Sequence, residues 1–195
     1  MSTPLVIRAV FWLWLLAAAA AGHYHLLERQ QLPAVQGLLL ALTAALVLAY
    51  RRLRTFREWV ESVDLRALVL LHATRLVGLY FLVLYWRGEL PYGFAIPAGV
   101  GDTLVASTAI LVVAYPFTDT ARRRAISIWN VVGLADILLV VLTALRIGLS
   151  RGDELRPLTY LPLSLLPTFL VPLLIASHLA IFLRLSRQDR PSADR

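Results

Sequence analysis

Residues 92–115 read YGFAIPAGVGDTLVASTAILVVAY, and Asp102 is the one charged side chain among them. A transmembrane helix needs about 20 mainly apolar residues, so this stretch is long enough to cross a bilayer. Four other stretches of the 195-residue chain meet the same requirement: 32–50, 67–86, 126–146 and 158–183. The sequence therefore predicts an all-α integral membrane bundle.

A further apolar segment, residues 5–22, admits two interpretations. Arg8, an apolar core and a run of alanines together form the pattern of a cleaved signal peptide. The two tryptophans in the segment and the multi-span body that follows favour a retained first helix instead. We expect six spans, or five if the segment is cleaved, in a single domain over residues 1–185. A disordered cytoplasmic tail is expected over residues 186–195.

The composition excludes several classes of protein. With 59% hydrophobic and 16% charged residues, the chain does not have the composition of a soluble domain. It contains neither Cys nor Lys, which excludes thiolate chemistry, iron–sulfur ligation and Schiff-base chemistry on its own side chains. The net charge of +7 does not indicate nucleic-acid binding, because the arginines collect at the ends of apolar segments, where the lipid bilayer is the expected partner.

The distribution of arginine predicts the orientation. With the N-terminus inside, thirteen arginines fall in inside segments and five in outside segments, while Arg75 lies within a span. The positive-inside rule then places both termini in the cytoplasm and the bundle in the cell's inner (plasma) membrane. The longest connection, residues 51–66, carries apolar residues at helical spacing among charges. This pattern predicts a short interfacial amphipathic helix between the second and third spans.

Polar side chains inside apolar spans are costly in hydrocarbon and usually mark a functional site. The spans of this chain contain six candidates: His72, Arg75, Asp102, Asn130, Asp136 and His178. At a rise of about 1.5 Å per residue, the two histidines lie roughly 9 Å from the cytoplasmic boundary, with the asparagine somewhat shallower. The arginine and the two aspartates lie about 13–15 Å deep. The sequence predicts a midplane charge cluster that opens toward a histidine layer.

The two aspartates share a local sequence pattern. Gly99-Val-Gly-Asp102 is similar to Gly133-Leu-Ala-Asp136, with small residues at the same offsets from each aspartate. The pattern places two carboxylates at matching depth on adjacent antiparallel helices. Arg75 and one aspartate could form an ion pair that fixes packing, but one arginine cannot neutralise both carboxylates. The second must be protonated, or paired with a histidine, a cation or a substrate.

These residues suggest several functions. The favoured hypothesis is that the bundle handles a proton, an ion or a small solute. Alternatively, His72 and His178 could be the axial ligands of haem b, or could hold a divalent metal together with nearby aspartates. A non-catalytic role as a subunit of a membrane complex or as a homo-oligomer is a further alternative, because the faces of small residues suit helix association.

Gly99-Val-Gly-Asp102 also resembles the Gly-x-Gly-Asp element of the intramembrane aspartyl proteases. The resemblance covers four residues and implies a membrane-embedded hydrolase with Asp102 and Asp136 as its two carboxylates. In that family the partner aspartate lies upstream and often follows tyrosine, whereas Asp136 lies downstream and follows Ala135. The family's Pro-Ala-Leu element is also missing here.

Overall fold

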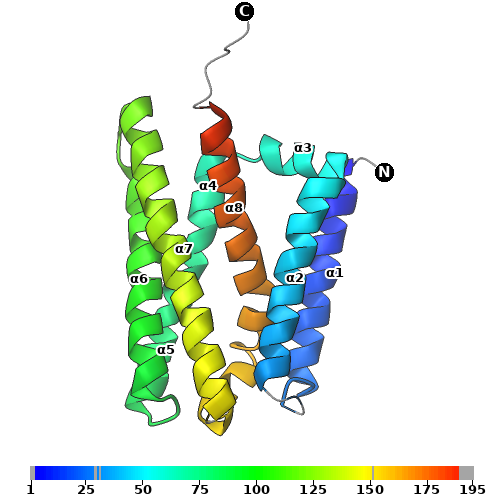
Figure 1. Cartoon of the computed structure of the whole chain (residues 1–195), viewed down its shortest axis with the longest axis vertical. Helices are drawn as coiled ribbons and strands as arrows, with labels where there is room; N and C mark the ends of the chain where they lie inside the picture. The colour runs from blue at the N-terminus through cyan, green and yellow to red at the C-terminus, as the bar shows by residue number, and fades with distance from the viewer. Residues whose placement is uncertain (1–2, 29, 31, 151, 189–195) are drawn as a thin grey trace, which may run out of the picture.

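A computed structural model of the chain describes residues 3–28, 30, 32–150 and 152–188, and within these ranges every regular element is a helix. Six of the helical segments in this part of the chain are long and apolar enough to cross a membrane. They run side by side along the long axis of the molecule (Figure 1). The prediction of an all-α chain is confirmed, and residues 5–22 form most of the first of these helices.

Four of the six membrane-length segments are single helices, and the third and sixth are each built from consecutive shorter helices. The helices have these bounds: α1 Thr3–His23, α2 Leu32–Arg52, α3 Arg54–Ser62, α4 Leu65–Leu70, η1 Leu71–Val77, α5 Gly78–Trp86, α6 Tyr92–Ala114, α7 Asp119–Ser150, η2 Gly152–Thr159, η3 Leu166–Leu170 and α8 Val171–Gln188. The third segment joins α4, the 3₁₀-helix η1 and α5 without a break. The sixth joins the π-helical turn η3 to α8.

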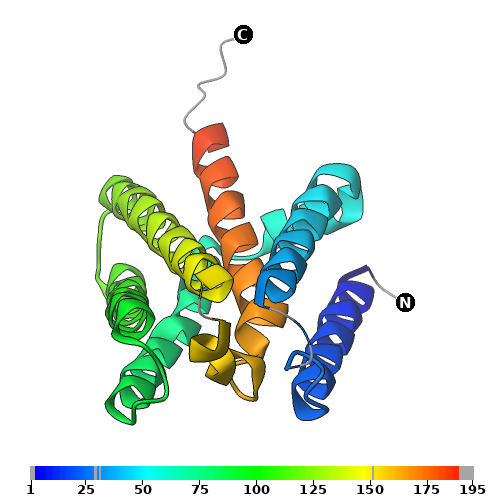
Figure 2. The same ribbon diagram turned by 60° about the horizontal axis from the view of Figure 1, so that its bottom comes forward.

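The last membrane-length helix begins at Leu166, not at residue 158 as the apolar pattern suggested. Pro162 and Pro167 account for the difference, because proline lacks a backbone N–H and is disfavoured in an α-helix interior but tolerated in a first turn, where Pro167 lies. Residues 160–165 therefore form turns between η2 and η3. Figure 2 shows this gold segment at the end of the bundle opposite the C-terminus of α8.

The expected amphipathic helix between the second and third spans is present as α3. It lies across the bundle axis at the end where α1 begins and α8 ends (Figure 1). None of its residues is buried, which suits a helix at the rim of the molecule. The tail expected to be disordered over residues 186–195 is helical as far as Gln188, and its remainder lies outside the described residues.

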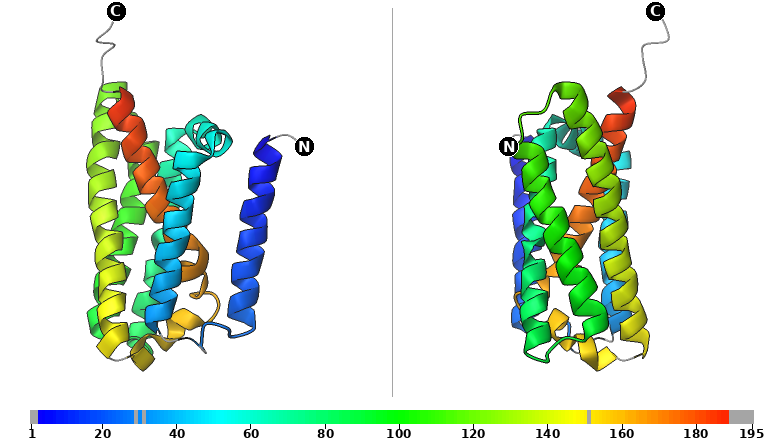
Figure 3. Two further views of the ribbon diagram at one scale, coloured as in Figure 1. Left: turned by 45° about the vertical axis from the view of Figure 1, so that its right-hand side comes forward. Right: turned by 90° about the vertical axis from the view of Figure 1, so that its left-hand side faces the viewer.

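Glycines allow the third segment to pack directly against α6. A Cβ added to Gly99 would lie 2.8 Å from the Gly78 carbonyl oxygen, and one added to Gly78 would lie 2.7 Å from the Asp102 Cβ. The two backbones are thus in contact, with no room for a side chain between them. The first helix stands apart from α2 (Figure 3). It is attached to η3, where the Trp14 indole donates to the Thr168 carbonyl oxygen at 2.8 Å.

We predict that Gly99→Ala destabilises the protein by about 1–3 kcal/mol, because the added methyl group overpacks a closed backbone contact. Gly93→Ala is the matched control, since a Cβ at this position of α6 meets nothing within 4 Å. Thermal unfolding in detergent measures both variants. A stability of Gly99→Ala equal to that of Gly93→Ala would contradict the close contact between the third segment and α6.

One ion pair joins the loop after α1 to η2. Glu28 accepts a hydrogen bond from the Tyr160 hydroxyl and another from Arg156 at 2.9 Å, while His25 Nδ1 lies 3.1 Å from its other oxygen. The bond from Tyr160, followed by that from Arg156, holds the pKa of Glu28 below its ordinary value of 4.5. A carboxylate with a depressed pKa stabilises the folded state above about pH 4.5, and this contribution is lost as the pH falls through the lower folded-state pKa.

We therefore expect Glu28→Gln to lower the unfolding temperature slightly at pH 7 and to change it little at a pH well below 4.5, where wild-type Glu28 is also neutral. Unfolding temperatures across this pH range make the test. Glu89→Gln, the same change in a loop where the side chain is exposed, is the control. An equal effect of Glu28→Gln at both ends of the pH range would show that the ionised Glu28 carboxylate does not stabilise the folded state.

Candidate functional site

The functional residues of the third segment lie on its 3₁₀-helical part, η1. In a 3₁₀-helix, side chains three residues apart eclipse each other, so His72 and Arg75 project toward the same side. Both are fully buried, with 0% and 1% of their surface exposed. The local geometry therefore presents an imidazole and a guanidinium to the bundle interior, one turn apart.

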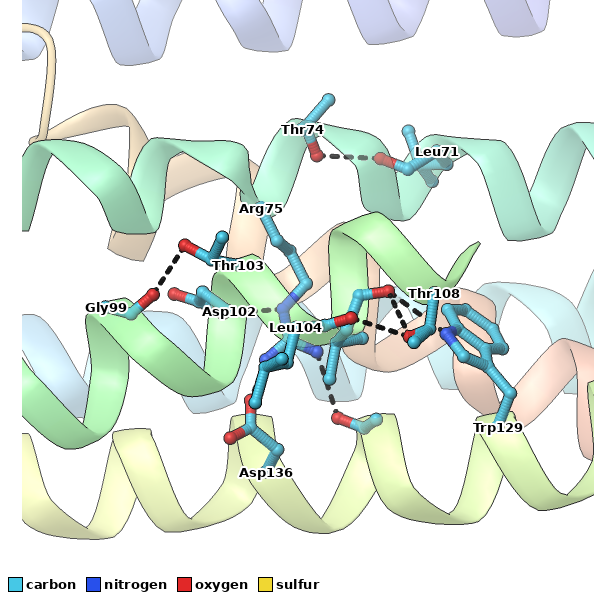
Figure 4. A network of polar contacts seen from close by, with 12 residues as sticks. Leu71, Thr74, Arg75, Gly99, Asp102, Thr103, Leu104, Thr108, Trp129 and Asp136 are labelled. Atoms are coloured by element: carbon cyan, nitrogen blue, oxygen red, sulfur yellow. Dashed lines mark hydrogen bonds and ion pairs between the residues drawn. The ribbon is translucent and has the colours of Figure 1, made fainter. Parts of the chain in front are cut away.

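Arg75 joins three helices through its guanidinium. Its Nε donates to Asp102 Oδ1 on α6 at 2.6 Å, and Nη2 donates to the Asp136 carboxylate on α7. The remaining nitrogen, Nη1, donates to the Gly133 carbonyl oxygen at 3.0 Å. Figure 4 shows the Arg75 side chain reaching from η1 past α6 toward Asp136. We call Asp102, Arg75 and Asp136 the charge triad.

Glycines make room for both carboxylates of the charge triad. A Cβ at Gly101 would lie 2.0 Å from Asp136 Oδ1, so any other residue there would displace that carboxylate. Asp102 packs in the same way over Gly78 of the third segment. Gly101 belongs to the repeated pattern seen in the sequence, and its role is to let α6 approach the aspartate of α7.

The charge triad carries unequal numbers of positive and negative groups. The side chains of Asp102 and Asp136 are only 12% and 22% exposed, and both form ion pairs with the same arginine. With both carboxylates ionised, the triad holds one negative charge in excess in an apolar surrounding. Such a charge is costly unless a proton or another positive group compensates it.

The two histidines form a second network. His72 Nε2 lies 2.9 Å from Ser177 Oγ, and the Ser177 hydroxyl donates to the Leu174 carbonyl oxygen at 2.8 Å. Because that hydroxyl proton is committed, His72 donates through Nε2, and Nδ1 is left as an acceptor. Nδ1 has no hydrogen-bond partner among the described residues.

The same argument assigns the proton of His178. Asn130 Nδ2 donates to the His178 carbonyl oxygen at 3.1 Å, so its Oδ1 is the acceptor for His178 Nδ1 at 2.7 Å. Nε2 of His178 is then a bare acceptor, and it too lacks a partner in the described part of the chain. Each histidine thus offers one unprotonated, buried nitrogen.

Gly133 connects the two networks. Its carbonyl oxygen accepts from Arg75, and a Cβ on it would lie 2.8 Å from the Cε1 and 3.2 Å from the Nε2 of His178. The free nitrogen of His178 therefore faces the backbone that holds the charge triad. Trp129 closes the other side of the histidines, with ring centroids 5.0 Å from His72 and 5.6 Å from His178.

A small cavity borders the charge triad. Its volume is about 60 Å³, and its walls include Arg75, Asp102 and the buried amide of Gln36, with apolar side chains elsewhere. A site of this size holds a few water molecules, since one water needs roughly 10–15 Å³ by this measure. It is well below the roughly 300–1,000 Å³ of pockets that bind organic ligands. The cavity at the triad therefore has room for a few water molecules and is smaller than a pocket for a peptide or an organic solute.

The histidines do not fit the haem site proposed from their equal depth. Axial ligands lie on opposite faces of a porphyrin, whereas the centroids of these two rings are 4.1 Å apart, in direct contact. There is no space for a porphyrin between them. No group of three or more His, Cys, Asp or Glu side chains in the described residues is arranged to hold a metal ion.

Five of the six candidate residues are buried and Asp136 is partly exposed, and the six are divided between the two networks. Two further residues of the site are not predicted from the sequence: Ser177, which contacts His72, and Gln36, which lines the cavity. Gln36 had a signal, as a polar side chain in an otherwise apolar span. No feature of the sequence indicated the role of Ser177, because serine hydroxyls are common in membrane helices and often form hydrogen bonds only with the backbone of their own helix.

Comparison with known proteins gives one match. A family model described as a domain of unknown function (DUF8737) matches residues 32–186. The matched region contains both networks and leaves out α1. No curated protein and no solved structure matches the chain.

We predict that Arg75→Met destabilises the protein by about 3–5 kcal/mol, because it leaves two buried carboxylates without their counter-charge. The triple variant Arg75→Met/Asp102→Asn/Asp136→Asn, which carries no buried charge at these positions, should recover most of that loss. Thermal or denaturant unfolding in detergent measures both. A triple variant no more stable than Arg75→Met would show that the cost is one of packing and not of charge.

Proposed function

The chain belongs to the family of the domain of unknown function DUF8737, and we propose that it is an integral membrane protein whose interior takes up and releases a proton. The observation that carries this proposal is the single guanidinium shared by two carboxylates whose side chains are only 12% and 22% exposed. The excess negative charge needs compensation in an apolar surrounding, and a proton supplies it without requiring space. The charge triad is the proton-binding group of this proposal.

The membrane setting rests on the helices and on the arginines at their ends. Six segments in the described ranges are long and apolar enough to span a bilayer, and α1 begins at the end of the bundle where α8 finishes (Figure 1). The excess of arginine in alternate connections supports a cytoplasmic location for this end. The exposed, amphipathic α3 would then lie along the inner surface of the membrane.

The histidines extend the proton site toward the cytoplasm. His178 Nε2 is a vacant acceptor beside Gly133, and His72 Nδ1 is a second vacant acceptor on a ring in contact with it. Both lie between the charge triad and the end of the bundle that carries α3. We propose that a proton passes between the triad and this histidine pair, which Gly133 brings next to each other.

The geometry argues against the other functions considered. A cation at the carboxylates would meet the Arg75 guanidinium, which already donates to both of them. An organic solute or a peptide substrate exceeds the cavity of about 60 Å³. The remaining alternative is a purely structural role for the charge triad, in a subunit of a larger complex. The following experiment distinguishes this role from proton binding.

Infrared difference spectroscopy on the purified protein tests the protonation. We expect the carbonyl stretch of a protonated carboxyl group, which disappears in the Asp102→Asn/Asp136→Asn variant because no titratable carboxyl remains in the interior. In proteoliposomes the same variant should reduce proton flux, followed with a trapped pH-sensitive dye, by at least about tenfold, within the range of effects of removing a group that transfers protons.

Asp119→Asn is the matched control, because it makes the same chemical change in the first turn of α7, where the side chain is exposed. It should keep both the infrared band and the flux. A double variant that loses stability but keeps the wild-type flux would assign the triad to helix packing alone and would overturn the proposed function.

A further inference from the structure

A second and much larger hollow lies outside the polar interior. It is a groove of about 930 Å³ bounded by α1, α2, α3, α4 and α8, at the end of the bundle where α1 begins. Its walls are mainly apolar, with the aromatic rings of Phe56, Trp59 and Phe169 among them. Arg8 and Arg51 are the charged residues on its described lining, and no carboxylate borders it.

The two arginines lack a counter-charge within the described part of the chain. Arg8, on α1, and Arg51, near the end of α2, are exposed, and neither side chain has a hydrogen bond or ion pair with a described residue. The nearby carboxylates of α3 are already engaged. Glu58 pairs with Arg54 at 2.7 Å, and Glu61 pairs with Arg187 and accepts from the Tyr50 hydroxyl at 3.0 Å. The described part of the chain therefore supplies no free carboxylate for these two arginines.

The groove is charged at one end and apolar along the rest of its length, as an amphiphilic ligand is. Its cationic groups lie at the end of the bundle expected at the cytoplasmic surface, and its apolar walls continue along α8 to Phe169 of η3, toward the middle of the bundle. Tyr50 and Trp59, side chains suited to the level of lipid headgroups, line it near the arginines. Its volume is at the upper end of the roughly 300–1,000 Å³ typical of ligand pockets.

We propose that this groove binds an anionic phospholipid of the surrounding bilayer, with its phosphate between Arg8 and Arg51 and an acyl chain along the apolar walls. Charge complementarity selects this occupant, because the groove supplies two unpaired cations and no described carboxylate. Anionic lipids are concentrated in the cytoplasmic leaflet, where positive-inside orientation places these arginines. The site is separate from the charge triad, but Ser177, the partner of His72, forms part of its wall.

Native mass spectrometry of the full chain tests this proposal. The protein is released from nanodiscs that contain equal amounts of phosphatidylglycerol and phosphatidylcholine with identical acyl chains. We expect the wild type to retain phosphatidylglycerol preferentially. Arg8→Gln/Arg51→Gln should reduce this preference on the order of tenfold, the effect expected for two arginines near a headgroup.

Two further variants distinguish the effect of the arginine charges on lipid retention from the effect of the space in the groove. Arg87→Gln/Arg146→Gln removes two exposed arginines at the opposite end of the bundle and should keep the wild-type preference. Ala176→Trp places a large side chain in the groove and should reduce retention of both lipids several-fold, with wild-type circular dichroism as the check on folding.

Equal retention of the two lipids by the wild type, or an unchanged preference in Arg8→Gln/Arg51→Gln, would overturn the proposal. So would a dimer that carries no lipid, because the groove would then be an interface between two copies. Arg75→Met/Asp102→Asn/Asp136→Asn, which leaves no unpaired charge at the triad, should retain lipid as the wild type does, so failure of the proton function would leave this inference standing.

Discussion

The burial of Arg75 is the constraint on which the rest of the structure depends. A guanidinium with 1% exposure cannot remain charged in an apolar bundle unless its donors are satisfied, and here two carboxylates and a backbone carbonyl satisfy them. These acceptors come from α6 and α7, so the arginine fixes three membrane-length segments relative to one another. The glycines at the contacts follow from the same need, because the acceptors reach Arg75 only if the backbones approach closely.

The same arrangement creates the charge imbalance on which the proposed function rests. Pairing both aspartates with one arginine gives a good packing contact and still leaves one negative charge uncompensated. Two histidines with vacant nitrogens lie beyond Gly133, and a cavity sized for water borders the triad. Packing and the proposed proton binding are therefore compatible explanations of these residues, since the contact that joins the helices also produces the excess negative charge.

The groove between α1 and α8 differs from the polar interior in where its charges lie. Between α1 and α8 the walls are mainly apolar and the two arginines lie at one end, which is the polarity on which the proposed lipid site rests. The first helix, outside the region matched by the family model, forms one wall of this groove and is attached mainly through Trp14 and its neighbouring rings. Ser177 belongs to both regions, because it contacts His72 of the interior and also lines the groove.

The sequence by itself determined the helical class, the approximate positions of the apolar helices and the six polar residues of the interior, because ionisable groups stand out in apolar segments and helical rise converts position into depth. It did not determine that one guanidinium serves both carboxylates, since that depends on the rotation of three helices about their axes. Nor could it place the start of the last helix, because three prolines each offered a break. The contact between His72 and His178, which excludes a haem between them, was likewise decided only by tertiary packing, since equal depth leaves the distance across the bundle open.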